Sequence, residues 1–388
     1  MSLHFIFGRA GTGKTTRCCR EIQDYLKKTP GGRAYLLVPD QGTYTAEYLL
    51  AKSFPGAGFI DVTVCGFSRL AYRVFQELHS PVADALSPLG QQIILRRLLD
   101  AHKDELQVIL RAASQPHFSE KLTAFFHQLD MFLITEDDLL AASQREGETP
   151  LGKKLADLSL LYKAYHDYLR MHFAYEGSLF DLLAREIPKS EKLRGSHIWI
   201  DGFNGMAPQK IRIVSALVHT AEEVTMTLQM DSPEEAAENP NFARPYQLYS
   251  QLQGAIRHSS SIVLTEEKRF RTSDLSLMAR HFFERHARPR PEDGRVKEGL
   301  HLITAESPKE EVDLISRTIT SLVRDKGLRY RDILVLSRTP ENYSDLFTRS
   351  FATYGIPGFI DEKHPMNNHP LVMLTSFLLQ FLAKETGR

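Results

Sequence analysis

A glycine-rich segment near the amino terminus constrains the fold of this chain more than any other feature. It matches the pattern G-x-x-x-x-G-K-[ST] at every defined position, follows an apolar stretch at residues 3–7 and precedes a helix-forming stretch at residues 16–26. In a loop of this kind, successive backbone N–H groups turn inward around a phosphate, and the helix N-terminus adds positive potential. The segment therefore predicts a nucleotide-binding strand–loop–helix unit; the alternative is an ordinary glycine-rich turn. The residues of the predicted loop are Gly8, Arg9, Ala10, Gly11, Thr12, Gly13, Lys14 and Thr15.

Three further positions bear on what such a site does. Lys14 is placed to reach the β- and γ-phosphates and Thr15 to ligate Mg²⁺. Asp201 follows the apolar residues 198–200 and is the expected second Mg²⁺ group, although an Asp here can also simply begin a turn. Hydrolytic motors usually carry a Glu at the next position to polarise the attacking water, but this chain has Gly202. The sequence thus predicts binding of ATP and Mg²⁺ with slow hydrolysis.

Composition limits the remaining possibilities. The 388 residues are 42% hydrophobic and 25% charged, as in ordinary globular domains, and the formal net charge is zero. A nucleic-acid site must therefore be a local patch rather than a global field. Three cysteines provide neither a disulfide framework nor a metal quartet. Without a recognisable signal peptide or a membrane-length apolar run, we expect a cytoplasmic protein.

The order of predicted elements indicates an α/β protein with a large helical insertion. Residues 86–187 have a helical period almost throughout, and Leu300 begins a second α/β pattern with strands expected at 300–304, 333–336 and 356–360. Strands of the first pattern are expected at residues 3–7, 34–38, 59–64, 197–201, 224–228 and 260–265. We divide the chain into 1–85 (first half of a P-loop domain), 86–190 (helical insertion), 191–298 (remainder and linker) and 299–388 (start of a second such domain).

Two strand-to-helix loops combine aromatic, amide and basic residues, and loops at the carboxyl ends of parallel strands are where ligands bind. Single-stranded DNA is held by stacking on aromatic rings and by polar contacts to phosphates. Candidate polar contacts are Gln41, Thr43 and Arg69, and candidate stacking residues are Phe67, Tyr72 and Phe203. The alternative for Phe67 and Tyr72 is a helical core face.

Two basic features remain open at this point. Arg338 follows the expected strand 333–336, where a second domain could present a guanidinium to a γ-phosphate; it is equally compatible with an ordinary surface position. Residues 280–290 are rich in Arg, His and Phe and fit either a DNA-backbone contact or a solvated linker.

Taken in order, the motifs resemble one family. They are G-R-A-G-T-G-K-T, L-V-P-D-Q-G-T-Y-T-A-E, C-G-F-S-R-L-A-Y-R-V-F, W-I-D-G-F, E-E-V-D-L-I-S-R-T-I, Y-R-D-I-L-V-L-S-R and H-P-L-V. The chain is similar, over essentially its whole length, to the N-terminal part of the AddB family, whose members are the second subunits of bacterial AddAB helicase–nucleases. The resemblance implies a superfamily 1 (UvrD/Rep-like) helicase core with RecA-like domains.

The resemblance further implies a role in processing double-strand break ends together with an AddA partner. In the family, the degenerate helicase core of the AddB-type protein holds the emerging 3′ strand and recognises Chi. The positions matching the DNA-contacting loops are Gln41, Thr43, Phe67, Arg69, Tyr72 and Phe203, and those matching the nucleotide site include Lys14 and Thr15. The family's nuclease domain and its four-cysteine iron–sulfur cluster have no counterpart in this sequence.

The departures from motor enzymes favour a strand-holding module. Besides Gly202, the chain lacks an adenine-reading segment before its first strand and the later helicase motifs, so we expect a fragment of a longer protein. The principal alternative is an autonomous superfamily 1 motor that hydrolyses ATP. A P-loop small-molecule kinase is a third possibility, disfavoured by the helical insertion and the second α/β pattern.

Overall fold

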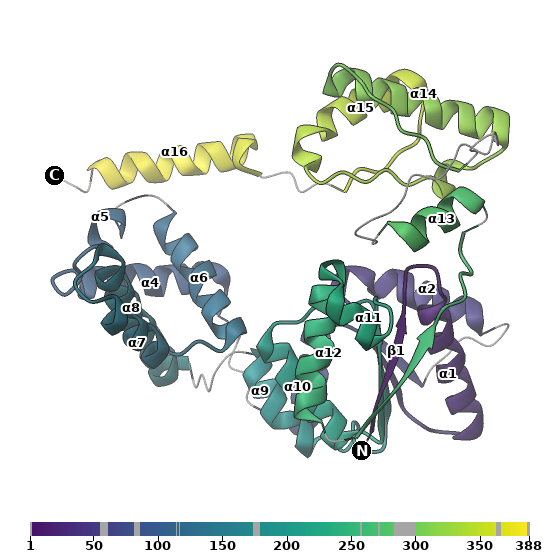
Figure 1. Cartoon of the computed structure of the whole chain (residues 1–388). Helices are drawn as coiled ribbons and strands as arrows, with labels where there is room; N and C mark the ends of the chain where they lie inside the picture. Colours follow the sequence, from purple (N-terminus) through teal and green to yellow (C-terminus); the bar gives the residue numbers. More distant parts are fainter. Residues whose placement is uncertain are drawn as a thin grey trace. The chain divides into compact units, whose positions relative to one another are not determined.

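The chain forms two compact units, unit 1 (Met1–Gly299) and unit 2 (Leu300–Arg388) (Figure 1). The computed structural model describes residues 2–54, 61–80, 86–113, 115, 117–173, 179–256, 258–270, 272–282, 299–361 and 366–385.

Unit 1 is built on a six-stranded parallel sheet with the strand order β3-β2-β4-β5-β1-β6. The strands are β1 Ser2–Gly8, β2 Ala34–Leu37, β3 Val62–Cys65, β4 His197–Ile200, β5 Glu223–Leu228 and β6 Ser259–Leu264. Each expected strand of the first pattern is present within the described residues, with ends shifted by up to a few residues; positions 59–60 of the expected strand 59–64 lie outside those residues. Because all pairs are parallel, the carboxyl ends of the strands meet at one edge of the sheet, which places the loops that follow them side by side.

Helices cover both faces of this sheet. Along β1, Phe5 and Phe7 face one core and Ile6 faces the other, as the two-residue period of a strand requires. The first core is shared with α3 (Phe67–Leu78), α10 (Pro208–Thr220) and α12 (Ala243–Ala255), and the second with α1 (Lys14–Lys28) and α2 (Thr43–Ser53). Figure 1 shows α1 and α2 on one side of β1 and α10 and α12 on the other. Such double coverage explains why β1, β2 and β4 are mostly apolar, whereas the edge strand β6 begins with three serines and is largely exposed.

The helical insertion has a hydrophobic core of its own. That core includes Leu95, Phe126 and Leu161, each at most 1% exposed, and shares no buried residue with the two sheet cores. Its helices are α4 Pro88–Ala101, α5 Leu110–Ala113, α6 Phe118–Phe132, α7 Glu136–Glu146 and α8 Pro150–Phe173. The described part of this region contains no strand, in agreement with its helical period.

The last part of the predicted insertion behaves differently. Helix α9 (Leu179–Glu186) and the 3₁₀ turn Ile187–Lys189 bury Leu183 and Ile187 in the sheet core, against α3 and α10. The insertion core therefore ends within α8, ahead of the expected boundary at residue 190. Periodicity cannot detect this change, because α9 is a helix in either case. The remaining elements of unit 1 are α11 Pro233–Glu238, α13 Ser273–His281 and the 3₁₀ turns Asp40–Gly42 and Pro240–Phe242.

Unit 2 differs from the expected second α/β pattern. Residues 300–304, 333–336 and 356–360 form no strand, and among their apolar side chains Leu302 is 98% and Leu336 83% exposed. A strand requires a neighbour for its backbone hydrogen bonds, and the described residues of unit 2 supply none. Its elements are α14 Pro308–Lys326, α15 Ser344–Tyr354, α16 Pro370–Glu385 and the 3₁₀ turns Tyr330–Asp332, Pro340–Asn342 and Met366–Asn368.

The expected helices of unit 2 are present, and α14 packs on α15. Helix α16 is apolar and largely exposed, as at Phe377 (68%) and Leu379 (62%). Within the described ranges, no helix combines the length and the apolar character needed to cross a membrane.

Candidate nucleotide site and adjoining loops

The glycine-rich segment connects β1 to α1 as the motif predicts. Gly11 and Gly13 have φ values of +86° and +88°, in the left-handed region that disfavours other residues. Gly8 is required for a different reason, because a Cβ atom there would lie 2.9 Å from the backbone oxygen of Leu264. Glycines at these positions thus allow the loop to turn tightly at the carboxyl edge of the sheet.

The amine of Lys14 lies folded into this loop. Its Nζ donates hydrogen bonds to the carbonyl oxygens of Gly8 (2.6 Å) and Arg9 (2.9 Å). Burial lowers the pKa of Lys14 from 10.5 to about 8; the carboxylate of Asp201 opposes this shift and Arg269 adds to it. A phosphate would replace two neutral carbonyl acceptors by a charged one, which favours the protonated amine.

The two expected Mg²⁺ groups lie in direct contact. Thr15 Oγ1 donates to Asp201 Oδ2 at 2.7 Å, and Thr227 at the end of β5 donates to the other carboxylate oxygen. Asp201 is only 7% exposed. It meets Thr15 although the two residues are far apart in the sequence. A hydroxyl and a buried carboxylate are oxygen ligands of the kind Mg²⁺ prefers, so the residues present fit this ion.

The backbone at Gly202, directly after Asp201, is unsuited to the carboxylate side chain that motors carry there. Gly202 has a φ of +83° and lies against the ring of Pro39, 3.4 Å from where a Cβ atom would be. A side chain at this position would be strained by the backbone conformation alone. Position 202 thus has neither the Glu of a motor nor a backbone conformation suited to one.

These residues line a cavity of about 430 Å³ that also contains residues not identified from the sequence. Gln229 follows β5, and Lys268 and Arg269 follow β6; the backbone N–H of Lys268 donates to Gly11 O at 2.8 Å. All three could have been identified from the sequence, because each follows a predicted strand at the same edge of the sheet. The remaining lining residues are Ala10, Gly11, Gly13, Lys14, Thr15, Thr16, Leu49, Asp201, Gly202, Phe203, Asn204 and Thr227.

Arg9 and Thr12 do not contribute side chains to this cavity. The guanidinium of Arg9 forms two hydrogen bonds of 2.6 Å with the carboxylate of Asp231, and the hydroxyl of Thr12 donates to Arg9 O at 2.9 Å. The prediction that Arg9 binds nucleotide therefore does not extend to its side chain, because its charge is already paired with a carboxylate. Only the backbone of residue 9 belongs to the loop.

The candidate DNA residues gather at the same edge of the sheet, after three neighbouring strands. Gln41 and Thr43 follow β2, Arg69 follows β3, and Phe203 follows β4. Gln41 and Arg69 are exposed, and Phe203 is partly exposed. Tyr72, one turn farther along α3 than Arg69, is 51% exposed. Two of the predicted stacking residues are thus accessible to a ligand.

Phe67 is an exception. Its side chain is 3% exposed and belongs to the sheet core. The centroid of its ring lies 5.4 Å from that of Phe203 and 5.6 Å from Lys210 Nζ. A base cannot stack on a ring covered in this way. The structure therefore supports the core alternative for Phe67, because the first residue of α3 faces the sheet.

The remaining candidates are Arg338, residues 280–290 and the three cysteines. Arg338 belongs to unit 2 and is exposed, so its role at the nucleotide stays a prediction. Of residues 280–290, positions 283–290 fall outside the described ranges. Cys18, Cys19 and Cys65 are all buried, and burial raises the pKa of each thiol.

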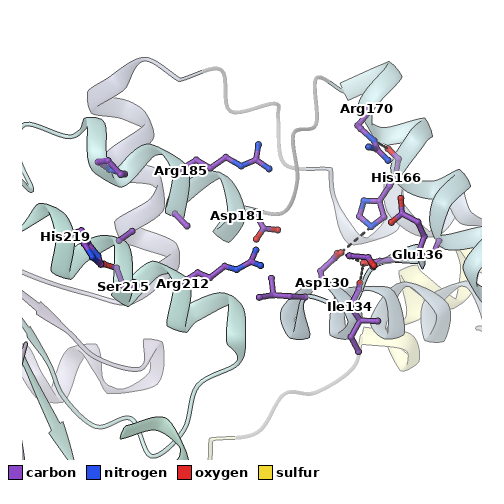
Figure 2. A pocket seen from close by; sticks show the side chains of 16 residues that line it. Asp130, Ile134, Glu136, His166, Arg170, Asp181, Arg185, Arg212, Ser215 and His219 are labelled. Atoms are coloured by element: carbon purple, nitrogen blue, oxygen red, sulfur yellow. Dashed lines mark hydrogen bonds and ion pairs between the residues drawn. The ribbon is translucent and has the colours of Figure 1, made fainter. Parts of the chain in front are cut away.

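A larger cavity of unit 1, about 1210 Å³, lies elsewhere, between the insertion and the sheet domain (Figure 2). Arg185 and Arg212 reach toward it from α9 and α10, opposite Asp130 and His166 of the insertion. Asp130 is engaged by Tyr162 (2.6 Å) and by His166 (3.3 Å). The lining mixes acidic and basic groups and contains no residue of the P-loop, so size alone does not make this cavity the functional site.

Comparisons with known proteins agree with the ordered motifs. A family model described as "ADDB, N-terminal" matches residues 5–279. Proteins named as the B subunit of an ATP-dependent helicase/deoxyribonuclease are 36% identical over 99% of this chain in Pelotomaculum thermopropionicum and 35% identical over 96% of it in Bacillus subtilis. These matches cover 34% and 33% of the relatives, so the chain spans about a third of their length. The chain therefore belongs to the AddB family, whose N-terminal region it represents.

Proposed function

We propose that this chain is the ATP-binding, single-strand-holding module of a heterodimeric helicase–nuclease that processes double-strand break ends for recombinational repair. Its relatives are named as one subunit of an ATP-dependent helicase/deoxyribonuclease, which supports a protein partner and a DNA substrate. The partner would be an AddA-type helicase–nuclease, and the strand held would be the 3′ strand that carries Chi. Such a complex would work in the bacterial cytoplasm.

The nucleotide site carries this proposal. Thr15 and Asp201 would hold Mg²⁺ and Lys14 would bind the phosphates, whereas Gly202 offers no carboxylate to polarise water. Mg²⁺ would supply charge neutralisation at the phosphates. We infer that the site binds ATP and hydrolyses it slowly, so that the nucleotide acts as a bound ligand and its hydrolysis does not drive movement along DNA. Arg338 would be a further phosphate contact from unit 2.

The DNA-holding part rests on the three loops beside this site. Their polar groups at Gln41, Thr43 and Arg69 would contact phosphates, and Tyr72 and Phe203 would stack on bases. Nuclease activity would reside in another part of the protein or its partner. The family's iron–sulfur cluster needs four cysteines, and this chain has three, all of them buried in the structure.

ATP turnover separates the strand-holding module from an autonomous motor. We expect the full chain to bind Mg–ATP but to hydrolyse it at well below about 1 s⁻¹, the lower end of typical enzyme turnover, with or without single-stranded DNA. A coupled phosphate-release assay measures this directly. DNA-stimulated turnover of many per second that is lost in Lys14→Ala would establish the motor instead.

Substitution of the exposed candidates tests the DNA-holding part. We expect Arg69→Ala and Tyr72→Ala each to weaken binding of a mixed-sequence single-stranded oligonucleotide about tenfold, the value of one stacking or charged phosphate contact. Fluorescence anisotropy at fixed salt measures the affinity. Arg73→Ala is the matched control, because Arg73 lies on the same helix but donates to Thr63 Oγ1 (3.0 Å). Equal affinities for all four proteins would remove the DNA assignment.

A further inference from the structure

The side chain of Arg9 connects the nucleotide loop to a helix that the proposed function does not use. Its guanidinium is held by Asp231 through two hydrogen bonds and is mostly buried, with 25% of the side chain exposed. The third nitrogen, Nη1, donates to the carbonyl oxygens of Ala279 (3.4 Å) and Arg280. These carbonyls belong to the last turn of α13, where a positive charge is favourable.

A second contact ties the same helix to the segment after β6. The carboxylate of Glu267 accepts hydrogen bonds from Ser276 and from Arg280 Nε (3.1 Å), both on α13. The next residue, Lys268, donates its backbone N–H to Gly11 in the nucleotide loop. Helix α13 is thus attached to the loop twice, through the side chain of Arg9 and through residues 267–268.

The opposite end of α13 lies at the junction with unit 2. Gly299, the last residue of unit 1, lies so close to Thr272, which precedes the helix, that a Cβ atom at 299 would overlap its side chain. The described chain continues from Gly299 into unit 2 at Leu300. Helix α13 therefore spans from the nucleotide loop to the point where unit 2 begins.

We propose that Arg9 is a positioning residue that couples phosphate binding in the loop to the order of α13. This inference rests on the proposed nucleotide binding. The carbonyl of Arg9 accepts hydrogen bonds from Lys14 Nζ and Thr12 Oγ1, while its side chain holds α13. A phosphate that takes the N–H donors of Lys14 removes one of these two side-chain donors from the carbonyl, so residue 9 is held less tightly and can shift. Because the guanidinium is a rigid fork clamped by Asp231, a backbone shift at residue 9 is transmitted to the last turn of α13.

Hydrogen–deuterium exchange of the full chain tests this coupling. On saturation with Mg–ATPγS, we expect exchange in the peptide covering 272–282 to change by about threefold or more. In Arg9→Lys, which keeps the charge but not the fork, we expect nucleotide affinity within about threefold of wild type and no nucleotide-dependent change in this peptide. Arg17→Lys is the matched control, because the guanidinium of Arg17 pairs with Glu21 on its own helix, α1 (2.7 Å).

Each outcome bears on one of the two proposals. Nucleotide binding without any change at 272–282 in wild type, or with the same change in wild type and Arg9→Lys, overturns the coupling and leaves nucleotide binding intact. A wild-type chain that fails to bind ATPγS overturns both. Should Arg9→Lys fold poorly, Asp231→Asn serves instead: it leaves Arg9 in place and removes the charge that clamps it, and it must reduce the response of α13.

Discussion

Replacing Lys14 by alanine is expected to weaken Mg–ATP binding about a hundredfold or more, while the fold is retained. The amine is mostly buried and donates two hydrogen bonds within the loop, positions from which it would contact phosphate oxygens. Two charge-assisted hydrogen bonds are worth about 3–6 kcal/mol together, which corresponds to at least two orders of magnitude in affinity. Isothermal titration with Mg–ATPγS measures the change.

The lowered pKa of Lys14 provides an internal control for this result. Below pH 8 the amine is protonated before nucleotide arrives; above pH 8 it must take up a proton to bind a phosphate, so affinity falls as pH rises. From pH 7 to pH 9 the expected loss is about tenfold for wild type and close to none for Lys14→Ala. Lys14→Arg, which stays charged, should also lose the dependence. If Lys14→Ala loses a hundredfold in affinity but the affinity of the wild type does not change with pH, burial does not lower the pKa of Lys14 as expected.

The sheet domain was predictable in detail because its signals are local and repeated. Short apolar runs marked β1, β2, β4 and β5, and each is buried on both faces. The motif at Gly8–Thr15 identified the loop, and the end of the apolar run at 198–200 identified Asp201. Their contact through Thr15 follows from parallel topology, in which strand ends distant in sequence meet at one edge.

What the sequence did not reveal depends on side-chain direction and on partners. Phe67 is aromatic and sits in the right loop, yet its position at the start of α3 turns it into the core. Arg9 lies inside the motif, yet its guanidinium binds the carboxylate of Asp231 instead of lining the cavity. In unit 2, the apolar runs at 300–304 and 333–336 satisfy the strand pattern but lack neighbours among the described residues, and pairing is a tertiary property.

The proposed function separates two roles that a motor combines at one site, nucleotide binding and water activation. Lys14, Thr15 and Asp201 would serve the first, whereas position 202, where motors usually carry a Glu, has no side chain. Gly202 adopts a backbone conformation that would strain a Glu, so restoring the carboxylate by substitution would not restore its position. The loops after β2, β3 and β4 are exposed. They would be accessible to a single strand of DNA whatever the rate of ATP hydrolysis in the neighbouring cavity.

A second large effect is expected in the helical insertion, on substitution of Asp157. This carboxylate on α8 is 3% exposed and accepts backbone N–H groups of Gln107, Val108 and Ile109 at 2.8–3.1 Å. Asp157→Ala leaves these donors without their partner and should destabilise the insertion by about 3–5 kcal/mol. Because the insertion has its own core, nucleotide affinity should stay within about twofold of wild type.

The single tryptophan of the chain makes this effect measurable region by region. Trp199 lies on β4 and reports the sheet domain, whereas far-UV circular dichroism reports the helices of both regions. In urea, Asp157→Ala should show an early loss of helical signal with the transition of Trp199 fluorescence unchanged. Asp167→Ala, on the same helix but exposed and paired with Arg170 (3.0 Å), should show neither. If both signals shift together in Asp157→Ala, the insertion and the sheet domain unfold as one cooperative unit in spite of their separate cores.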